Sequence, residues 1–415
     1  MRNITVVGAG QSGLMVALGL LKKGYKVTLL SDRTPEEIRT GRVLSSQGMF
    51  WQAIQNERDL GLRFWEDKCP KWQKIEFNTL TRDGQIEVSL CRVPEGDVES
   101  VDQRVKMPAW MEEFVKLGGD LRIEEVGIDE LEHYAEQSDL VLMATGKGEI
   151  GRLFERDAEK SPFDQPMREL ALTYVAGMEP VAPRNGDAPF LGLVWNGYPG
   201  VGEYFCCPCL TTTGMCYVMI FEGVMGGPMD CWQDVKTPED HLQKSLSLLE
   251  KFFPWEAERC EHVELTDDNG RLNGRFPPTV RKPIAHLPSG QLITAIGDTV
   301  VVNDPLTGQG ANNASKSGKL VHDRVVEHGD RPFDAQWMQQ TFDLFWNDIQ
   351  HVTKWTNALL TRPPAAGMKV MQAADENGRL ADAVISGMND ASVFEPMFYD
   401  DAAADRFIAS FLHRP

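Results

Sequence analysis

The sequence predicts an α/β protein: a parallel β-sheet packed with helices, a second domain built on another β-sheet, and a C-terminal helical segment. Three observations support this fold class. A glycine-rich turn, GAGQSG at residues 8–13, joins an apolar strand to an apolar helix at the start of the chain. Residues 166–284 are rich in short alternating segments separated by glycine and proline, and residues 331–415 carry aromatic side chains at helical spacing.

The glycine-rich turn has the spacing of a dinucleotide cradle. Gly8 allows the tight turn from strand to helix, Gly10 lets the backbone approach a pyrophosphate, and Gly13 allows close packing of the helix. Phosphates would bind at the N-terminus of that helix, where Gln11 and Ser12 carry free backbone N–H groups. We therefore expect the chain to begin with a nucleotide-binding unit.

The order of the following elements predicts the rest of this unit. A second strand at 25–30 ends near Asp32, whose carboxylate is placed to meet an adenosine ribose. Helices are expected at 49–60 and 102–117, and a continuous apolar strand at 138–144 returns the chain to the sheet. We assign this domain, with a β-rich insertion near 70–100, to residues 1–165 and 285–330.

The middle of the chain reads as a separate β-sheet domain, residues 166–284. Its predicted strands lie at 191–195, 203–210 and 215–221, and one long helix is expected at 237–253. Residues 331–415 are assigned to C-terminal helices.

Charge and hydropathy exclude several classes of partner. The 415 residues include 42 basic and 61 acidic side chains, a net charge of −19, which argues against a nucleic-acid surface and against binding to an anionic membrane. The apolar run at 14–21 is too short to span a bilayer and follows a strand rather than a basic segment. We expect a soluble, cytoplasmic protein.

The eight cysteines are expected to be thiols. Cys206, Cys207, Cys209 and Cys216 form a cluster, but its spacing is not that of paired zinc ligands. On an alternating strand Cys207 and Cys209 share a face, so they are interpreted as small pocket or core side chains. The histidines are scattered and no Gly-x-Ser-x-Gly motif occurs, so we predict neither a metal site nor a serine hydrolase.

A second informative segment lies at residues 297–313. A predicted strand at 292–296 runs into Gly297-Asp298, and a loop rich in proline and glycine then leads into a helix. Asp298 is placed to accept hydrogen bonds from a polyol, and the positive end of the helix can face a flavin ring and stabilise its anionic reduced form. The loop and the helix start supply the further cofactor candidates Pro305, Gly308, Gly310, Ala311 and Asn312.

These motifs, in this order, resemble the glutathione-reductase-type flavoprotein monooxygenases, which have a Rossmann-like FAD-binding domain. In that family the Gly-Asp pair contacts the ribityl chain of FAD, and the Pro-x-x-Gly-x-Gly loop lies beside the isoalloxazine. Within it the chain is most similar to the oxygenase components of styrene and indole monooxygenases. The matching segments are Asp32-Arg33, Arg42-Val43-Leu44, residues 101–104, Ala144-Thr145-Gly146-Lys147, residues 304–312 and Trp355-Thr356-Asn357.

The resemblance implies an enzyme that binds reduced FAD, reacts with O2 and forms a C4a-hydroperoxyflavin, which epoxidises or oxygenates a small aromatic alkene or indole. The cofactor carries the chemistry, so no acid or base on the protein is required. Single-component relatives have an Asp-Gly motif, tied to NAD(P)H, where this chain has Thr145-Gly146. This difference favours a separate NAD(P)H-dependent flavin reductase as partner, and the resemblance is also compatible with a homodimer. Ser31 replaces a glutamate of many relatives, so Asp32 is expected to make the ribose contact.

The resemblance also suggests where FAD and substrate lie. Arg42 resembles an arginine that approaches the FAD phosphates, with a solvated loop charge as the alternative. Gln103 is expected either to reach the cofactor or to pair locally. The substrate would lie between the flavin and the β-sheet domain, where ordinary core packing is the alternative for each apolar side chain. The pocket candidates are Ser45, Ser46, Val194, Phe205, Cys207, Cys209 and Pro305.

Two other functions stay open on the sequence. A single-component NAD(P)H-dependent aromatic hydroxylase would bleach its bound flavin with NAD(P)H alone. A flavin-binding redox protein without oxygenase activity would release peroxide and form no oxygenated product.

Overall fold

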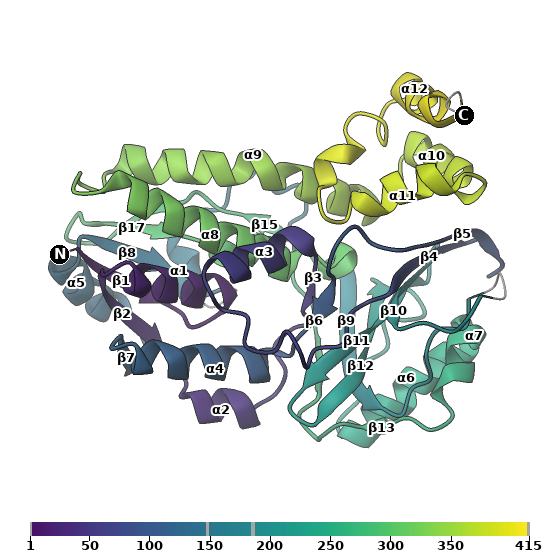
Figure 1. Ribbon diagram of the computed structural model, residues 1–415, viewed down its shortest axis with the longest axis horizontal. Helices are drawn as coiled ribbons and strands as arrows, with labels where there is room; N and C mark the ends of the chain where they lie inside the picture. Colours follow the sequence, from purple (N-terminus) through teal and green to yellow (C-terminus); the bar gives the residue numbers. More distant parts are fainter. Residues whose placement is uncertain (1, 147–148, 184–186, 413–415) are drawn as a thin grey trace.

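The computed structural model describes residues 2–146, 149–183 and 187–412, which form two large β-sheets with helices around them (Figure 1). The helices are α1 (Gln11–Lys22), α2 (Pro35–Thr40), α3 (Trp51–Asp59), α4 (Gln103–Lys116), α5 (Ile128–Gln137), α6 (Pro238–Phe252), α7 (Pro254–Ala257), α8 (Gly310–His328), α9 (Ala335–Leu359), α10 (Ala365–Asp375), α11 (Gly378–Ser386) and α12 (Asp401–Leu412). The strands are β1 (Asn3–Val7), β2 (Lys26–Ser31), β3 (Gly48–Met49), β4 (Lys74–Leu80), β5 (Ile86–Arg92), β6 (Glu99–Ser100), β7 (Asp120–Ile123), β8 (Leu140–Met143), β9 (Arg168–Ala176), β10 (Gly192–Tyr198), β11 (Gly202–Thr211), β12 (Gly214–Val224), β13 (Glu264–Leu265), β14 (Arg271–Gly274), β15 (Thr279–Val280), β16 (Ile284–His286), β17 (Leu292–Ala295) and β18 (Val301–Val302).

The first sheet has six strands in the order β16-β17-β8-β1-β2-β7. All neighbours are parallel except β16, which runs antiparallel to β17 at one edge. Ile4 and Val6 of β1 face a core shared with α1, α4 and α8, whereas Val7 faces a core shared with α5. Helices on both faces of a parallel sheet are the Rossmann-like arrangement that the sequence predicts, and the α/β fold class is confirmed.

The second sheet has eight strands, with β13-β9-β12-β11-β10-β4-β5 in order and β14 also paired with β9. The expected β-rich insertion near 70–100 is therefore corrected: β4 and β5 extend the sheet of the second domain, since β4 pairs in parallel with β10. The free edge of β10 supplies the hydrogen bonds that a lone hairpin lacks. At this junction the backbones approach so closely that a Cβ on Gly192 would lie 1.9 Å from the carbonyl oxygen of Lys74.

The two faces of the second sheet have different coverings, because successive side chains of a strand point to opposite sides. Phe205 and Cys207 of β11 face a core that also contains side chains of α10, α11 and the 3-10 helix 391–394. Tyr204 and Cys206 face a second core with α6. The predicted C-terminal helices thus lie over the second sheet near β4 and β5, at the upper right of Figure 1.

Helix α9 connects the two sheets and runs along the top of the view in Figure 1. Its Phe342 and Phe345 pack in the core that the parallel sheet shares with α5, while Val352 and Trp355 pack in the core of the second sheet. Within the described ranges, no helix has the length and apolar character needed to cross a membrane.

Candidate functional site

The glycine-rich turn shows which glycines the fold requires and which one faces open space. A Cβ on Gly8, where φ is +112°, would lie 2.3 Å from the carbonyl oxygen of Ala144, and one on Gly13 would lie 2.1 Å from that of Gly8. These two glycines pack the turn against its neighbours. Gly10 has an ordinary extended φ of −87°, and a Cβ there would have no neighbour within 4 Å. The space at Gly10 is what a bound diphosphate requires.

The two residues that begin α1 direct their side chains into the protein. The Gln11 amide donates to Oε1 of buried Glu57 at 2.8 Å. Ser12 packs against Gly297, where a Cβ would lie 2.4 Å from the serine Oγ. What α1 offers to an anion is therefore its backbone N–H groups, because no side chain caps this helix.

Three other cofactor candidates lie in the connection after β2 and at the start of α4. Asp32 follows the end of β2, is largely exposed and forms an ion pair with Arg33 at 3.6 Å. Arg42 is also exposed. The Gln103 amide donates to Oγ of Ser45, 58 positions earlier in the sequence, at 3.0 Å.

The ends of β8 and β17 bring two more motifs together, since these strands are parallel neighbours. The N–H of Gly146 donates to Oγ1 of Thr299 at 2.9 Å, and Thr145 Oγ1 is buried without a hydrogen-bond partner in the described part of the chain. Gly297, with φ of +58°, starts a 3-10 helix that places Asp298 half-buried beside them. The cofactor candidates of β1, β8 and β17 thus share the carboxyl edge of the parallel sheet, where open α/β sheets bind ligands.

The loop before α8 follows Asp304 as a short 3-10 helix, Pro305–Thr307, and turns at Gly308 with φ of +65°. A Cβ on Gly308 or Gly310 would meet nothing within 4 Å. Asn312 has a structural role: its Oδ1 accepts from the N–H of Phe50 at 2.8 Å, and its Nδ2 donates to the carbonyl of Gly48 at 3.0 Å. Ala311 is buried beside it. The glycines, and not the Asn312 side chain, face the open side of the loop.

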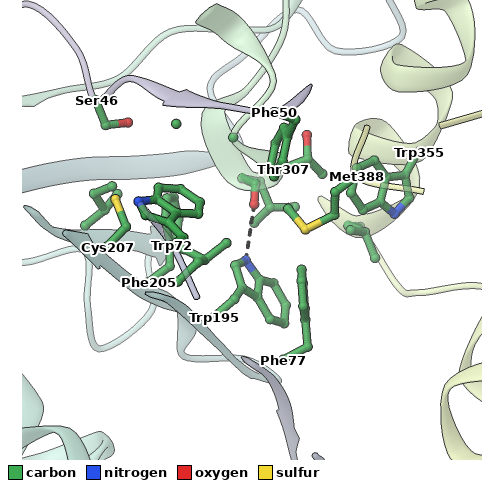
Figure 2. A pocket seen from close by; sticks show the side chains of 16 residues that line it. Ser46, Phe50, Trp72, Phe77, Trp195, Phe205, Cys207, Thr307, Trp355 and Met388 are labelled. Atoms are coloured by element: carbon green, nitrogen blue, oxygen red, sulfur yellow. Dashed lines mark hydrogen bonds between the residues drawn. The ribbon is translucent and has the colours of Figure 1, made fainter. Parts of the chain in front are cut away.

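An apolar cavity lies between this loop, the second sheet and the C-terminal helices (Figure 2), with about 510 Å³ of empty space when the open solvent at its mouth is included. None of its 16 lining residues carries a carboxylate, an amine, a guanidinium or an imidazole. The lining residues are Ser46, Gly48, Phe50, Trp72, Phe77, Leu193, Trp195, Phe205, Cys207, Ile220, Leu306, Thr307, Gly308, Trp355, Leu359 and Met388.

Hydrogen bonds fix the orientation of two tryptophans in this cavity. Trp195 Nε1 donates to the carbonyl of Leu306 at 3.2 Å, the dashed line in Figure 2, and its ring lies 5.3 Å from the ring of Phe77. Trp72 Nε1 donates to the carbonyl of Pro208 at 3.0 Å. Because these polar atoms are already satisfied, the rings present apolar faces to a ligand.

Some pocket candidates line the cavity and others do not. Ser46, Phe205 and Cys207 do. Ser45, Cys209 and Pro305 lie outside the lining, and the Cys209 thiol instead accepts from Ser100 Oγ at 3.3 Å.

Val194, another pocket candidate, does not line this cavity. It points to the opposite face of β10 and packs with Val181 and Phe190, while its neighbours Leu193 and Trp195 line the cavity. A one-residue difference in register exchanges the two faces of a strand.

Most of the aromatic lining was not predicted from the sequence. Side chains alternate between the two faces of β10, so Trp195 could have been predicted once another residue of the same face is known to line the cavity. Phe77 required the pairing of β4 with β10. Trp355 and Met388 come from the C-terminal region, and no local pattern connects them to the loop.

The thiol in the cavity is not a nucleophile. Burial raises the pKa of Cys207 well above its ordinary value, so the group stays a neutral thiol. Among the residues that the structure describes, no group of three or more histidine, cysteine or acidic side chains is placed to hold a metal ion.

Comparison with known proteins gives a consistent family. Residues 146–259 match the family model described as "Styrene monooxygenase A putative substrate binding domain". Two relatives, both called styrene monooxygenase StyA, come from Pseudomonas fluorescens and from a Pseudomonas species. Each is 27% identical over 401 residues, which cover 94% of this chain and 93% of the relative.

Solved structures share the fold at low sequence identity. A flavin-dependent brominase, Bmp2, has a TM-score of 0.67 at 13% identity and covers 99% of this chain and 98% of its own. A flavoprotein/dehydrogenase from Cytophaga hutchinsonii has a TM-score of 0.67 at 14% identity, with 99% of both chains covered. The two relatives and the matched domain show that the chain is similar to styrene monooxygenases over nearly its whole length.

Proposed function

We propose that the chain is the oxygenase component of a two-component system. It would take reduced FAD from a separate NAD(P)H-dependent flavin reductase and use O2 to epoxidise or oxygenate a small aromatic alkene or indole. The observation that carries the proposal is the aromatic cavity without ionic side chains beside the loop 304–308. The names of the two long relatives, both styrene monooxygenases, support a substrate of this class.

The residues at the sheet edge fit FAD. The open space at Gly10 and the N-terminus of α1 would hold the diphosphate, with Arg42 close to it. Thr145 Oγ1, which is buried without a partner in the described chain, and Asp298 would receive the polyol. The ring would lie beside Gly308 and the start of α8. When bound, the flavin supplies oxygen activation and transfer.

The chain contributes binding, orientation and exclusion of water. The positive end of α8 would stabilise negative charge on a reduced flavin. The bond from Trp195 to Leu306 fixes the loop against the second sheet. The apolar lining keeps water from the reaction space, and it suits an electrophilic oxygen transfer that needs no acid or base on the protein.

A single-turnover reaction tests the two-component proposal. Protein is mixed with chemically reduced FAD in oxygenated buffer, with styrene or indole and without NAD(P)H, and products are separated by chromatography. We expect oxygenated product in proportion to the reduced FAD added. Peroxide without product from either substrate would contradict the oxygenase function for this substrate class.

A second arm separates the single-component alternative. Oxidised FAD bound to the protein is mixed with NAD(P)H under anaerobic conditions, and the flavin absorbance is followed. The proposal predicts no bleaching until a flavin reductase is added. Rapid bleaching by NAD(P)H alone would show that the chain reduces its own flavin.

Replacing Asp298 with alanine is expected to weaken FAD binding about tenfold. The change removes a carboxylate acceptor for a polyol hydroxyl, and such a charge-assisted hydrogen bond contributes about 1.5 kcal/mol. A fluorescence titration with FAD measures the effect, and a thermal melt checks the fold. An unchanged dissociation constant would show that the carboxylate does not contact the cofactor.

Two neighbouring cysteines provide a matched test of the cavity. Cys207→Leu adds volume to the cavity lining, so we expect a lower kcat/KM for styrene with FAD affinity retained. Cys206→Leu enlarges a fully buried side chain on the other face of β11 and is expected to cost about 1–3 kcal/mol of stability. Equal effects of both changes on turnover would contradict the assignment of the two faces.

A further inference from the structure

One wall of the cavity comes from the C-terminal region of the chain. Met388, between α11 and the 3-10 helix 391–394, is 5% exposed and lines the cavity together with Trp355 of α9. In Figure 2 its side chain reaches in from the side of the C-terminal helices. A methionine side chain is unbranched and flexible, so it adapts to the space that its backbone leaves it. The position of this wall therefore depends on what holds the backbone of Met388.

A buried glutamine beside the start of α8 holds that backbone. Nε2 of Gln309 donates to the carbonyl oxygen of Met388 at 2.7 Å, a contact across 79 positions of sequence. Gln309 is only 2% exposed, so the bond is shielded from water and correspondingly strong. A hydrogen bond restricts both distance and direction, whereas apolar packing is non-directional. The bond therefore fixes Met388 relative to the start of α8.

Gln309 stands between two glycines that face the open side of the loop. Gly308 lines the cavity and has a φ of +65°, and a Cβ on Gly308 or on Gly310 would meet nothing within 4 Å. The side chain of Gln309, in contrast, is buried and directed to Met388. One residue thus connects the place assigned to the flavin ring with the wall that Met388 forms.

Two nearby hydrogen bonds hold the same regions by other atoms. Oγ1 of Thr307 lies 2.6 Å from Oγ1 of Thr356, which fastens the loop to α9. The N–H of Gln52 donates to Oδ1 of Asn389 at 2.9 Å, which fastens the segment around Met388 to α3. Neither bond involves the carbonyl of Met388. Without Gln309 we therefore expect loop and wall to stay folded, while the distance between them is no longer fixed.

We propose that Gln309 is a positioning residue that sets the depth of the cavity, because it holds Met388 at a fixed place relative to the loop 304–308. The inference rests on the proposed function for the nature of the ligand, an uncharged aromatic molecule. Loss of the bond lets the segment around Met388 move, so the ligand is held less tightly. The cofactor keeps its contacts, because the Gln309 side chain is directed away from the space beside Gly308 and Gly310.

Methyl NMR of the apoprotein tests the position of Met388 without any ligand. The methionine methyl groups are labelled isotopically, and Met388→Ala identifies the signal. We expect Gln309→Leu to shift or broaden this signal, since the methyl group lies among aromatic rings whose local fields vary steeply with distance. Gln372→Leu is the matched control: Gln372 is exposed on α10 and donates to Glu87 at 3.2 Å. A Met388 signal that is the same in wild type and Gln309→Leu would overturn the proposal.

Binding of ethylbenzene tests the effect on the ligand without turnover. This probe has the ring and side-chain length of styrene but no double bond to oxygenate, and headspace gas chromatography measures its dissociation constant with protein that carries oxidised FAD. A buried hydrogen bond changes an equilibrium by about three- to tenfold, so we expect Gln309→Leu to raise the dissociation constant by that factor. FAD affinity should be retained, and Gln372→Leu should resemble wild type in both measurements.

The outcomes of this titration separate the positioning role from the proposed function. Equal ethylbenzene affinity in wild type and Gln309→Leu, or a loss of FAD affinity that matches the loss for ethylbenzene, would overturn the role of Gln309 alone. A wild-type protein that binds no ethylbenzene would contradict the substrate class of the proposed function. The methyl signal of Met388 would then still decide the role of Gln309.

A double variant shows whether Gln309 acts through Met388. Met388→Ala removes the side chain that Gln309 places, so Gln309→Leu should have little further effect on ethylbenzene binding in that background. Additive effects of the two changes would show that Gln309 acts elsewhere and would refute the proposal. If Gln309→Leu does not fold, Gln309→Asn gives the same comparisons, because its amide is one methylene shorter and falls short of Met388.

Discussion

Replacing Gly10 with valine is expected to abolish FAD binding and to leave the apoprotein folded. The φ of −87° at Gly10 suits any residue, and a Cβ there would have no protein neighbour within 4 Å. The side chain would instead enter the space assigned to the diphosphate. Overpacking against a rigid backbone costs about 3 kcal/mol, so we expect the dissociation constant for FAD to rise about 100-fold or more. A fluorescence titration measures the affinity, and circular dichroism during heating measures the stability.

Gly13→Ala is the matched control within the same turn. Its Cβ would lie 2.1 Å from the carbonyl oxygen of Gly8, so this change strains the junction between β1 and α1 themselves. We expect Gly13→Ala to lower the melting temperature of the apoprotein and Gly10→Val to leave it within a degree or two of wild type. Normal FAD affinity in folded Gly10→Val would refute the assignment of the diphosphate site.

This contrast shows what a local motif predicts. The turn at residues 8–13, the end of β8 and the segment 297–312 are each recognisable from neighbouring residues, so the sequence assigned all three to one cofactor. Side-chain directions were not predictable in the same way. Gln11 binds Glu57, a contact across 46 positions of sequence, and Asn312 binds the backbone of Phe50, a contact across 262.

The cavity was the least predictable part for a related reason. Its lining combines β4, β10 and β11 with the loop 304–308 and two segments of the C-terminal region. The pairing of β4 with β10 joins strands more than 100 residues apart, and no periodic pattern in the sequence predicts it. The alternation of side chains along β10 defines two faces, but it does not tell which face lies toward the flavin. Val194 was therefore assigned to the face opposite the one it occupies.

The sequence did not predict a buried ion pair next to the glycine-rich turn. Lys106 Nζ lies 2.6 Å from Oε1 of Glu57, and both side chains are fully buried. The ammonium also lies 5.1 Å and 5.4 Å from the ring centres of Trp65 and Trp110. Because Glu57 also accepts a hydrogen bond from Gln11, this ion pair is linked to the first turn of α1 and helps to hold it in place. Charged residues are rare in cores, so the amphipathic pattern of α4 gave no reason to place Lys106 inside.

Lys106→Met is therefore expected to destabilise the protein by about 3–5 kcal/mol, because it leaves the Glu57 carboxylate buried without its closest cation. Lys116→Met on the same helix is the matched control. Lys116 is 74% exposed and pairs with Glu113 three residues earlier, so its loss should cost less than about 0.5 kcal/mol.

The double variant Glu57→Gln with Lys106→Met separates charge from packing. It removes both charges and keeps an amide beside Gln11, so it should unfold at a higher denaturant concentration than Lys106→Met alone. Chemical denaturation of wild type, Lys106→Met, Glu57→Gln and the double variant measures the differences. If the double variant is as unstable as the sum of the two single changes predicts, the cost comes from lost packing around Trp65 and Trp110. If it recovers stability, the cause is the Glu57 carboxylate left with Arg63, at 3.3 Å, as its remaining cation. The same titrations with FAD then show how far the support of α1 reaches into the cofactor site.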